Sequence, residues 1–305
     1  MIYTLTLNPA VDYFVTLHDS LEPGQLNRSA GECVVFGGKG INVSRVLSAL
    51  GIENTALGFV AGFTGKALEE ELRNAGLHTR FLHVTGGMTR INVKVSAGEE
   101  TEINGQGPHI GAEDMERLFA LLDSLEPGDM LVMSGSLAAG MVPDSYGAIL
   151  QRLSGRGVDA VVDAAGETLR SALRYRPFLI KPNHPELAEF FGRKLDNKSE
   201  IVECARALQS MGARNVLVSM GAEGALLVDE TGICHRITAP RGNVVSTVGA
   251  GDSMVAGFLA GWLGSGSYAE ALRLGAAAGS ATAFSLGLAD GEMIKKVYSE
   301  MEELL

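Results

Sequence analysis

The sequence predicts an α/β protein in which helices cover both faces of a mostly parallel sheet and a smaller β-sheet projects from it. Strand patterns alternate with helix patterns over most of the 305 residues, which favours parallel pairing. Hydrophobic residues make up 46% of the chain, enough for a substantial core. Four strand patterns have no helix between them. We therefore expect one domain, 1–305, with an additional small sheet.

The elements of the main layer follow from local patterns. Residues 2–8 alternate and are β-branched, which predicts a strand. Apolar spacing over 39–50 predicts a helix that stops at Gly51, and Thr64 is a candidate N-cap of a helix ending near Gly76. The other expected strands are 129–135, 158–163, 177–181, 215–221 and 225–229, and the other expected helices are 112–125, 144–155, 167–174, 184–192, 197–211, 250–264, 268–286 and 290–304.

The strands without helices lie within about 11–36 and 89–105. They are the segments 11–17 and 26–36, and then 90–96 and 100–105. A sheet made of these strands would expose apolar residues such as Val15, Val34 and Val93, which need a partner face. The pattern therefore favours a homodimer formed through this sheet.

Composition excludes several classes of protein. The formal net charge of −11 argues against a nucleic-acid partner and requires that any anionic substrate meet a local cluster of Lys and Arg. The three cysteines, Cys33, Cys204 and Cys234, are scattered and lack metal-ligand spacing, as is typical of reduced cysteines in the cytosol. The N-terminus does not resemble a signal peptide, and the most apolar helix is too short for a bilayer. We expect a cytoplasmic protein with no membrane partner.

The stretch TVGAGDSMVAG at 247–257 places small residues and a carboxylate at the start of a predicted helix. A glycine turn with a capping Asp252 would explain it structurally. The functional interpretation is that the N–H groups of 249–252 stabilise charge on a transferred phosphoryl group. Asp252 would then take the proton from an acceptor hydroxyl.

The stretch FGGKGINVSRVLSALG at 36–51 holds a lysine among glycines before a helix. Three glycines cost backbone entropy, and Lys39 is placed to meet an anion or a sugar hydroxyl, while Asn42 could bind a polyol. Neither stretch has the spacing of a P-loop or of a Rossmann glycine motif, which makes a P-loop NTPase or an ordinary dehydrogenase a poor match.

These two stretches resemble the paired signatures of the PfkB (ribokinase-like) carbohydrate kinases. The segments TLNPAVD (6–12), TRINVK (89–94), TEINGQGP (101–108), SGSL (134–137) and KPNHPE (181–186) are similar to the 1-phosphofructokinase and tagatose-6-phosphate kinase branch, and most like its 1-phosphofructokinases. The resemblance implies a three-layer αβα ribokinase-like fold with a small protruding β-sheet lid that often forms the dimer contact.

The resemblance also implies a role for each matching residue. Asp252 would be the catalytic base, and Gly249, Ala250 and Gly251 would form the anion hole. The sugar-phosphate positions are Asp12, Arg28, Gly37, Gly38, Lys39, Asn42, Arg90 and Ser136. The nucleotide positions are Lys181, Asn183, Ser219, Gly221 and Gly224, with an adenine wall within 276–285 and with Asn183 and Glu186 holding Mg²⁺ through water and phosphate.

Structural explanations exist for several of these residues. Asp12 could form an Asx turn, Arg90 could be a solvated strand charge, and Asn183 with Glu186 could simply begin a helix. The resemblance implies ATP- and Mg²⁺-dependent phosphorylation of D-fructose 1-phosphate to fructose 1,6-bisphosphate. The alternatives are a tagatose-6-phosphate kinase that makes tagatose 1,6-bisphosphate, and a catalytically silent sugar-phosphate sensor.

Overall fold

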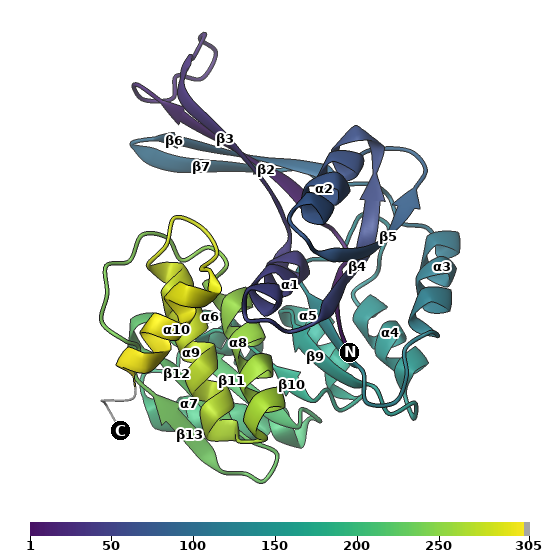
Figure 1. Ribbon diagram of the computed structural model, residues 1–305, viewed down its shortest axis with the longest axis vertical. Coiled ribbons are helices and arrows are strands. Elements are labelled where there is room, and N and C mark those ends of the chain that lie inside the picture. Colours follow the sequence, from purple (N-terminus) through teal and green to yellow (C-terminus); the bar gives the residue numbers. More distant parts are fainter. Residues whose placement is uncertain (302–305) are drawn as a thin grey trace.

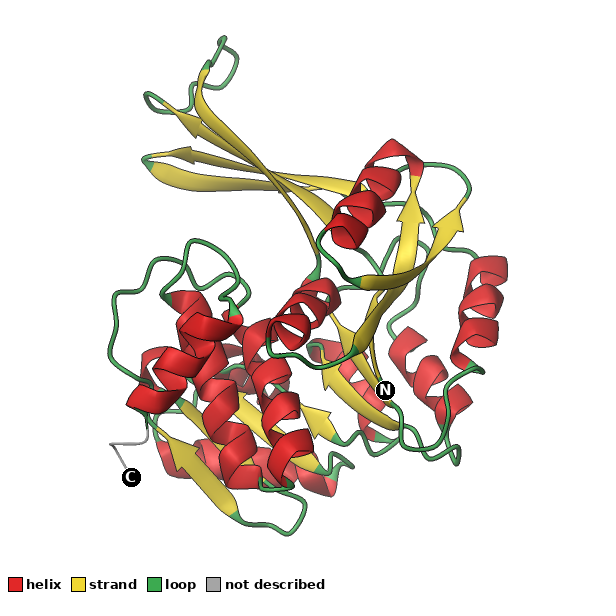
Figure 2. Cartoon of the chain, in the orientation of Figure 1, coloured by secondary structure: helices red, strands yellow, loops and turns green. Residues whose placement is uncertain are grey.

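The computed structural model describes residues 1–301, and over them a nine-stranded sheet forms the middle of the molecule (Figures 1 and 2). Neighbouring strands pair in parallel from β11 to β5, while β12 and β13 are antiparallel additions at one edge. In spatial order the strands are β13 (Cys234–Ile237), β12 (Ala225–Val228), β11 (Asn215–Ser219), β10 (Leu179–Ile180), β9 (Asp159–Asp163), β8 (Met130–Ser134), β1 (Ile2–Thr6), β4 (Asn54–Ala61) and β5 (His78–Val84).

Helices cover both faces of this sheet because alternate strand residues are apolar toward each side. In β8, Leu131 and Met133 pack into one core and Val132 into the other. One layer holds α3 (Ala112–Leu122), α4 (Ser145–Leu153), α5 (Gly166–Leu173), α6 (His184–Phe191) and α7 (Lys198–Ser210), and the other holds α1 (Lys39–Ala49), α2 (Gly62–Asn74), α8 (Ala250–Ser265), α9 (Tyr268–Ala283) and α10 (Gly291–Glu300). The predicted three-layer α/β class is confirmed.

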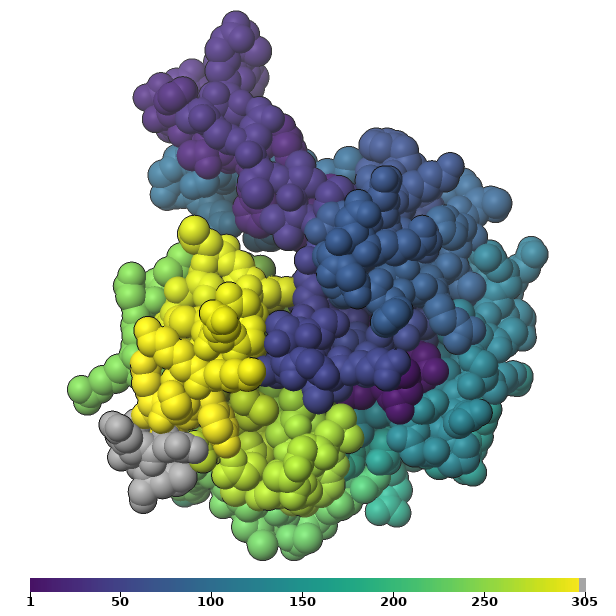
Figure 3. Space-filling view, viewed as in Figure 1, coloured from purple at the N-terminus to yellow at the C-terminus, as the bar shows by residue number. Residues whose placement is uncertain are grey.

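A second, four-stranded sheet extends away from the body (Figures 1 and 3). We call it the projecting sheet; its strands, in spatial order, are β3 (Ser29–Gly37), β2 (Ala10–Leu17), β6 (Arg90–Ala97) and β7 (Glu99–Asn104). Val34 and Val35 of β3 are about half exposed, at 49% and 46%. The projecting sheet therefore presents apolar side chains to its surroundings.

Some elements differ from the sequence expectations. Strands β4 and β5 were not predicted. The prediction of a Thr64 cap is wrong: α2 begins at Gly62 after Ala61, and the Thr64 hydroxyl donates to the backbone oxygen of Thr89. Strand β10 has only two residues of the expected 177–181, and α9 ends at Ala283 instead of 286. The expected helix 290–304 corresponds to α10, and its residues 302–304 lie outside the described residues.

No helix within residues 1–301 is long and apolar enough to cross a membrane.

Candidate active site

The polar residues of the site gather at the carboxyl ends of the parallel strands. Asn8 follows β1, Ser136 follows β8, Asp163 ends β9, Lys181 follows β10 and Ser219 ends β11. Ligands of open α/β sheets bind at this edge, because the loops there leave a crevice between the strand ends and the helices. The order of the strands thus brings residues from distant parts of the sequence together.

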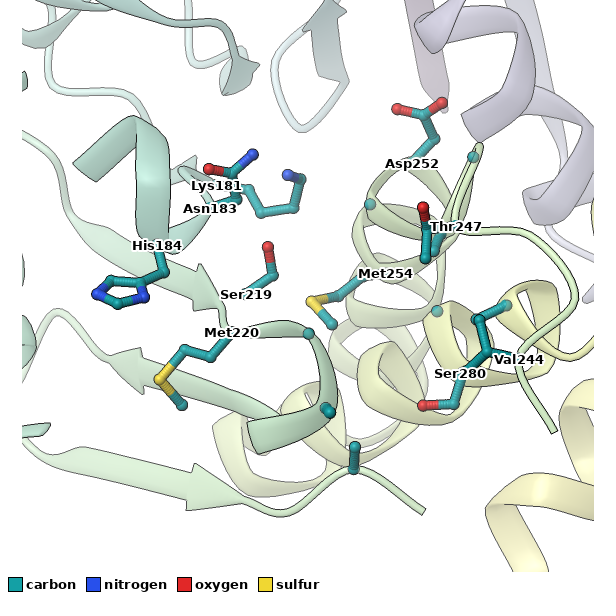
Figure 4. A pocket seen from close by; sticks show the side chains of 18 of the residues that line it. Lys181, Asn183, His184, Ser219, Met220, Val244, Thr247, Asp252, Met254 and Ser280 are labelled. Carbon is teal, nitrogen blue, oxygen red and sulfur yellow. The ribbon is translucent and has the colours of Figure 1, made fainter. Parts of the chain in front are cut away.

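Two cavities open along this edge. The larger one, of about 890 Å³, lies between the start of α6 and the end of β11 on one side and α8 and α9 on the other (Figure 4). The smaller one, of about 520 Å³, is lined by residues such as Arg90, Ser136 and Thr168. Lys39, Asp163 and Glu186 line both cavities. The two cavities are therefore neighbouring compartments of one site.

Asp252 stands in the first turn of α8, beside the shared wall. It is only 5% exposed, and its Oδ2 accepts a hydrogen bond of 2.8 Å from the Nδ2 of Asn42 on α1. Burial, and next the charge of Asp163, raise the pKa of Asp252 to about 7; the Asn42 hydrogen bond, Lys39 and Lys181 oppose that rise. A carboxyl group with a pKa near neutrality is suited to accept a proton at physiological pH.

The start of α8 provides backbone N–H groups next to that carboxylate. Gly249 precedes the helix with φ of 80°, a left-handed conformation that glycine adopts without strain. The N–H of Gly251 has no partner inside the helix, because a helix leaves its first N–H groups free. A Cβ at Gly251 would lie 3.2 Å from the Nζ of Lys181, so the glycine allows the ammonium to approach the helix start. This arrangement can receive an anion.

The glycines before α1 serve close packing. A Cβ at Gly38, whose φ is 143°, would lie 2.6 Å from the Cγ2 of Thr6, and the N–H of Ile41 donates to the Thr6 hydroxyl. The helix start is thus held against the end of β1, with the Lys39 side chain between the cavities. Burial lowers the pKa of Lys39, but the charges of Asp163 and other carboxylates outweigh it and raise that pKa.

Asp163 is a central residue that the sequence reasoning missed. It is 2% exposed and lies 3.5 Å from the Nζ of Lys39 and 3.2 Å from the Nζ of Lys181, which is itself 4% exposed. A carboxylate that closes an otherwise apolar strand, in AVVD, was the available signal, because a buried charge needs partners. Asp163 thus pairs with Lys181 of the larger cavity and with Lys39, which lines both cavities.

Asn183 and Glu186 form the reciprocal cap of α6. The N–H of Glu186 donates to the Asn183 Oδ1 and the N–H of Asn183 donates to the Glu186 Oε2, both at 2.8 Å. Glu186 still faces both cavities. Among residues 1–301 there is no group of three or more His, Cys, Asp or Glu that could enclose a metal ion. The oxygen ligands present, Asn183, Glu186 and Asp163, fit a hard divalent cation that keeps several of its waters.

On the sugar side, the structure places some predicted residues at the smaller cavity and others elsewhere. Arg90 and Ser136 line it. Burial lowers the pKa of Arg90, and the charge of Asp12 opposes this. Asp12 lies outside the lining and accepts a 2.8 Å hydrogen bond from Asn92. Arg28 is exposed in the connection from β2 to β3 and lines neither cavity.

Of the remaining predicted glycines, one lines a cavity and two do not. Gly221 lines the larger cavity together with Ser219. Gly224 does not line it; a Cβ there would collide with the backbone of Ile237, so the residue allows close strand packing. Gly37 lies at the end of β3, where a Cβ would be 3.3 Å from the Oδ1 of Asn42.

The wall of the larger cavity that faces α9 includes the segment predicted for adenine. Gly279, Ser280, Ala283 and Phe284 line it, all within 276–285. Sequence reasoning did not find the neighbouring residues, which belong to an irregular connection that packs against Phe284: Ala239, Pro240, Arg241, Gly242 and Val244. That connection has no periodic pattern from which a wall could have been predicted.

Comparison with known proteins agrees with this geometry. The family model described as pfkB family carbohydrate kinase matches residues 5–295. The chain is 45% identical over 302 residues to a 1-phosphofructokinase of Bacillus subtilis, with 99% of each chain covered. It is 40% identical to a D-tagatose-1-phosphate kinase of Bacillus licheniformis, again with 99% of each chain covered.

Solved structures show the same architecture. The phosphofructokinase-2 of Escherichia coli in complex with fructose-6-phosphate superimposes with a TM-score of 0.90 at 31% identity, covering 99% of both chains. The ribokinase of Arabidopsis thaliana complexed with ribose and ATP has a TM-score of 0.79 at 20% identity and covers 97% of this chain and 98% of its own. The second likeness establishes the ribokinase-like fold alone.

Proposed function

We propose that this chain, which belongs to the pfkB family of carbohydrate kinases, transfers the γ-phosphoryl group of ATP to D-fructose 1-phosphate and forms fructose 1,6-bisphosphate. The observation that carries the proposal is Asp252, a buried carboxyl group with a pKa of about 7 beside the wall that two cavities share. A kinase of this kind needs one compartment for each substrate and a proton acceptor between them.

In this mechanism ATP occupies the larger cavity and the sugar phosphate the smaller one. The free primary hydroxyl of the sugar attacks the γ-phosphorus while its proton passes to the Asp252 carboxylate. The bond from the γ-phosphorus to the bridging oxygen breaks, and ADP leaves. The Gly251 N–H and the Lys181 ammonium stabilise the charge on the transferred group.

Mg²⁺ would be held through water by Asn183 and Glu186, with Asp163 nearby, and it supplies neutralisation of the nucleotide phosphates. The reciprocal cap of α6 keeps the Glu186 carboxylate directed along the shared wall of the cavities. The capping explanation and the metal role are compatible because a carboxylate has several acceptor positions.

Arg90 is proposed to bind the phosphate that the sugar already carries. It lines the smaller cavity, and a guanidinium forms strong, paired hydrogen bonds with a phosphate. In a chain of net charge −11, such a local cation is needed to attract an anionic substrate. Lys39, which lines the smaller cavity, is proposed to discriminate among ring hydroxyls. Asp12 and Asn42 stay predictions for the same role, because neither lines that cavity.

A second candidate substrate is D-tagatose 1-phosphate. The similarity to the D-tagatose-1-phosphate kinase of Bacillus licheniformis supports this candidate. It differs from fructose 1-phosphate in one ring hydroxyl configuration and presents the same two arms. In tagatose 6-phosphate the phosphate and the free hydroxyl are exchanged between the two exocyclic arms of the furanose ring. Because the ring is nearly two-fold symmetric, this sugar could bind in the reversed orientation. A silent sensor is disfavoured because Asp252, Asn183 and Glu186 are all in place.

We also propose that the enzyme is cytoplasmic and forms a homodimer through the projecting sheet. The half-exposed Val34 and Val35 support a covered face there.

The test is ADP formation from ATP and Mg²⁺ with fructose 1-phosphate, tagatose 1-phosphate, tagatose 6-phosphate and fructose. We expect the highest kcat/KM with fructose 1-phosphate and poor turnover of fructose, which leaves Arg90 without a partner. A preference for either tagatose phosphate would refute the choice of sugar, and a preference for free fructose would refute the phosphate site.

A further inference from the structure

Arg90 is held at one nitrogen only. It begins β6 at the base of the projecting sheet, opposite Ala10, and its Nε donates a 3.2 Å hydrogen bond to the backbone oxygen of Asn8. Over residues 1–301, no hydrogen bond or ion pair engages its two terminal amino groups. A guanidinium fixed at Nε keeps its remaining N–H groups in a defined plane for a bidentate anion.

The Asn8 side chain fixes the residue that provides this anchor. Asn8 is 6% exposed, and its Nδ2 donates to the backbone oxygens of Gln106 at 3.1 Å and Leu137 at 3.3 Å. Gln106 lies in the connection after β7 and Leu137 in the loop after β8. One amide therefore ties the segment between β1 and β2, where Asn8 lines the smaller cavity, to the connection after β7 and to the loop after β8, which also lines that cavity.

The residues around Asn8 and Arg90 are closely packed and leave no room for a side chain at Gly105 or Gly107. A Cβ at Gly107 would collide with the Asn8 Oδ1 and would lie 3.7 Å from the Cβ of Arg90, and a Cβ at Gly105 would lie 3.2 Å from the same atom. The Asn8 Oδ1 is buried without a hydrogen-bond partner. A buried polar group left unpaired is costly, so the two donated bonds must outweigh that cost for the amide to remain here.

We propose that Asn8 is a positioning residue for Arg90, and that it thereby sets the preference for a phosphorylated sugar over the same sugar without phosphate. Among uncharged side chains, only a primary amide can donate to two carbonyls from one nitrogen. Without it the Asn8 backbone oxygen and the two loops lose their common tie, and the guanidinium loses its fixed orientation. The inference rests on the proposed function, in which Arg90 binds the substrate phosphate.

The test compares Asn8→Ala, Arg90→Ala and the double variant with the wild type, using fructose 1-phosphate and free fructose. We expect Asn8→Ala to lower kcat/KM for fructose 1-phosphate roughly 5- to 50-fold, mainly through KM, as for loss of part of a charged hydrogen bond. Turnover of fructose and KM for ATP should change by less than about 3-fold, since neither uses Arg90. In the Arg90→Ala background, Asn8→Ala should cost little more.

Asn104→Ala, at an exposed asparagine on the nearby β7, is the matched control and should leave all constants unchanged. Asn8→Ser keeps one donor and supplies an intermediate effect if Asn8→Ala does not fold. Equal losses with both sugars, or fully additive losses in the double variant, would overturn the positioning role. The wild-type constants test the proposed function separately. If another ketohexose phosphate is preferred, the same comparison uses that phosphate and its free sugar. A wild-type enzyme that does not prefer the phosphorylated sugar overturns the inference.

Discussion

The two cavities meet along a shared wall beside Asp252 but are built differently. The lining of the larger one includes many small residues from turns and helix starts, such as Gly221, Gly249 and Ala250. The smaller one differs from it in side chains such as Arg90 and Ser136, which come from segments far apart in the sequence. Backbone recognition leaves compact, recognisable stretches in a sequence, whereas recognition by side chains from scattered loops does not.

The largest expected effect falls where the cavities meet. Asp252→Asn keeps the size of the side chain but removes the proton acceptor. We expect kcat to fall roughly 10²–10⁴-fold, the usual loss when a general base is removed. ATP and sugar-phosphate binding, measured by calorimetry, should persist in the same variant. Near-normal kcat would show that Asp252 is not the base, and loss of both ligands would show that the site had collapsed.

A smaller effect is expected from a substitution of Asn42, which donates a hydrogen bond to the Asp252 carboxylate. Asp252 acts when ionised, so activity should decline as the pH falls through its pKa of about 7. The Asn42 hydrogen bond lowers that pKa by favouring the ionised form. Asn42→Ala should therefore raise the pKa and move the acid limb of the kcat profile to higher pH, with a few-fold loss at pH 7.

The control for this experiment is Asn104→Ala, which lies on the projecting sheet and should keep the wild-type profile. An acid limb that stays in place, or moves to lower pH, in Asn42→Ala would separate Asn42 from the titration of Asp252.

The difference between the cavities also explains what the sequence could predict. The α/β class, the projecting strands and the α8 start were predictable because periodicity and glycine motifs are local properties. Asp163 was missed because its meaning depends on Lys39 and Lys181, which the fold brings within 3.5 Å and 3.2 Å. Strands β4 and β5 were also missed. Thr64 was misread as a cap because its hydroxyl bonds the backbone oxygen of Thr89, a tertiary contact that overrides the local preference.

Arg90 is a second residue whose role could not be predicted from the local sequence. A single arginine at the start of a strand carries no chemical signal by itself, and it was chosen from the resemblance. The structure gives it a physical context: it is half-buried at the base of the projecting sheet, and burial lowers its pKa. Asn8 acquires meaning only with the carbonyls of Gln106 and Leu137, which lie 98 and 129 residues away in the sequence.

The central claim is that each cavity recognises its own substrate, and Arg90→Ala tests it most directly. Steady-state constants of this variant should show KM for fructose 1-phosphate raised roughly 10- to 150-fold, as for loss of a charge-assisted hydrogen bond of about 1.5–3 kcal/mol. KM for ATP should change little, because Arg90 lines the smaller cavity and not the larger one. A loss that falls mainly on ATP, or equally on both substrates, would contradict the division of the site.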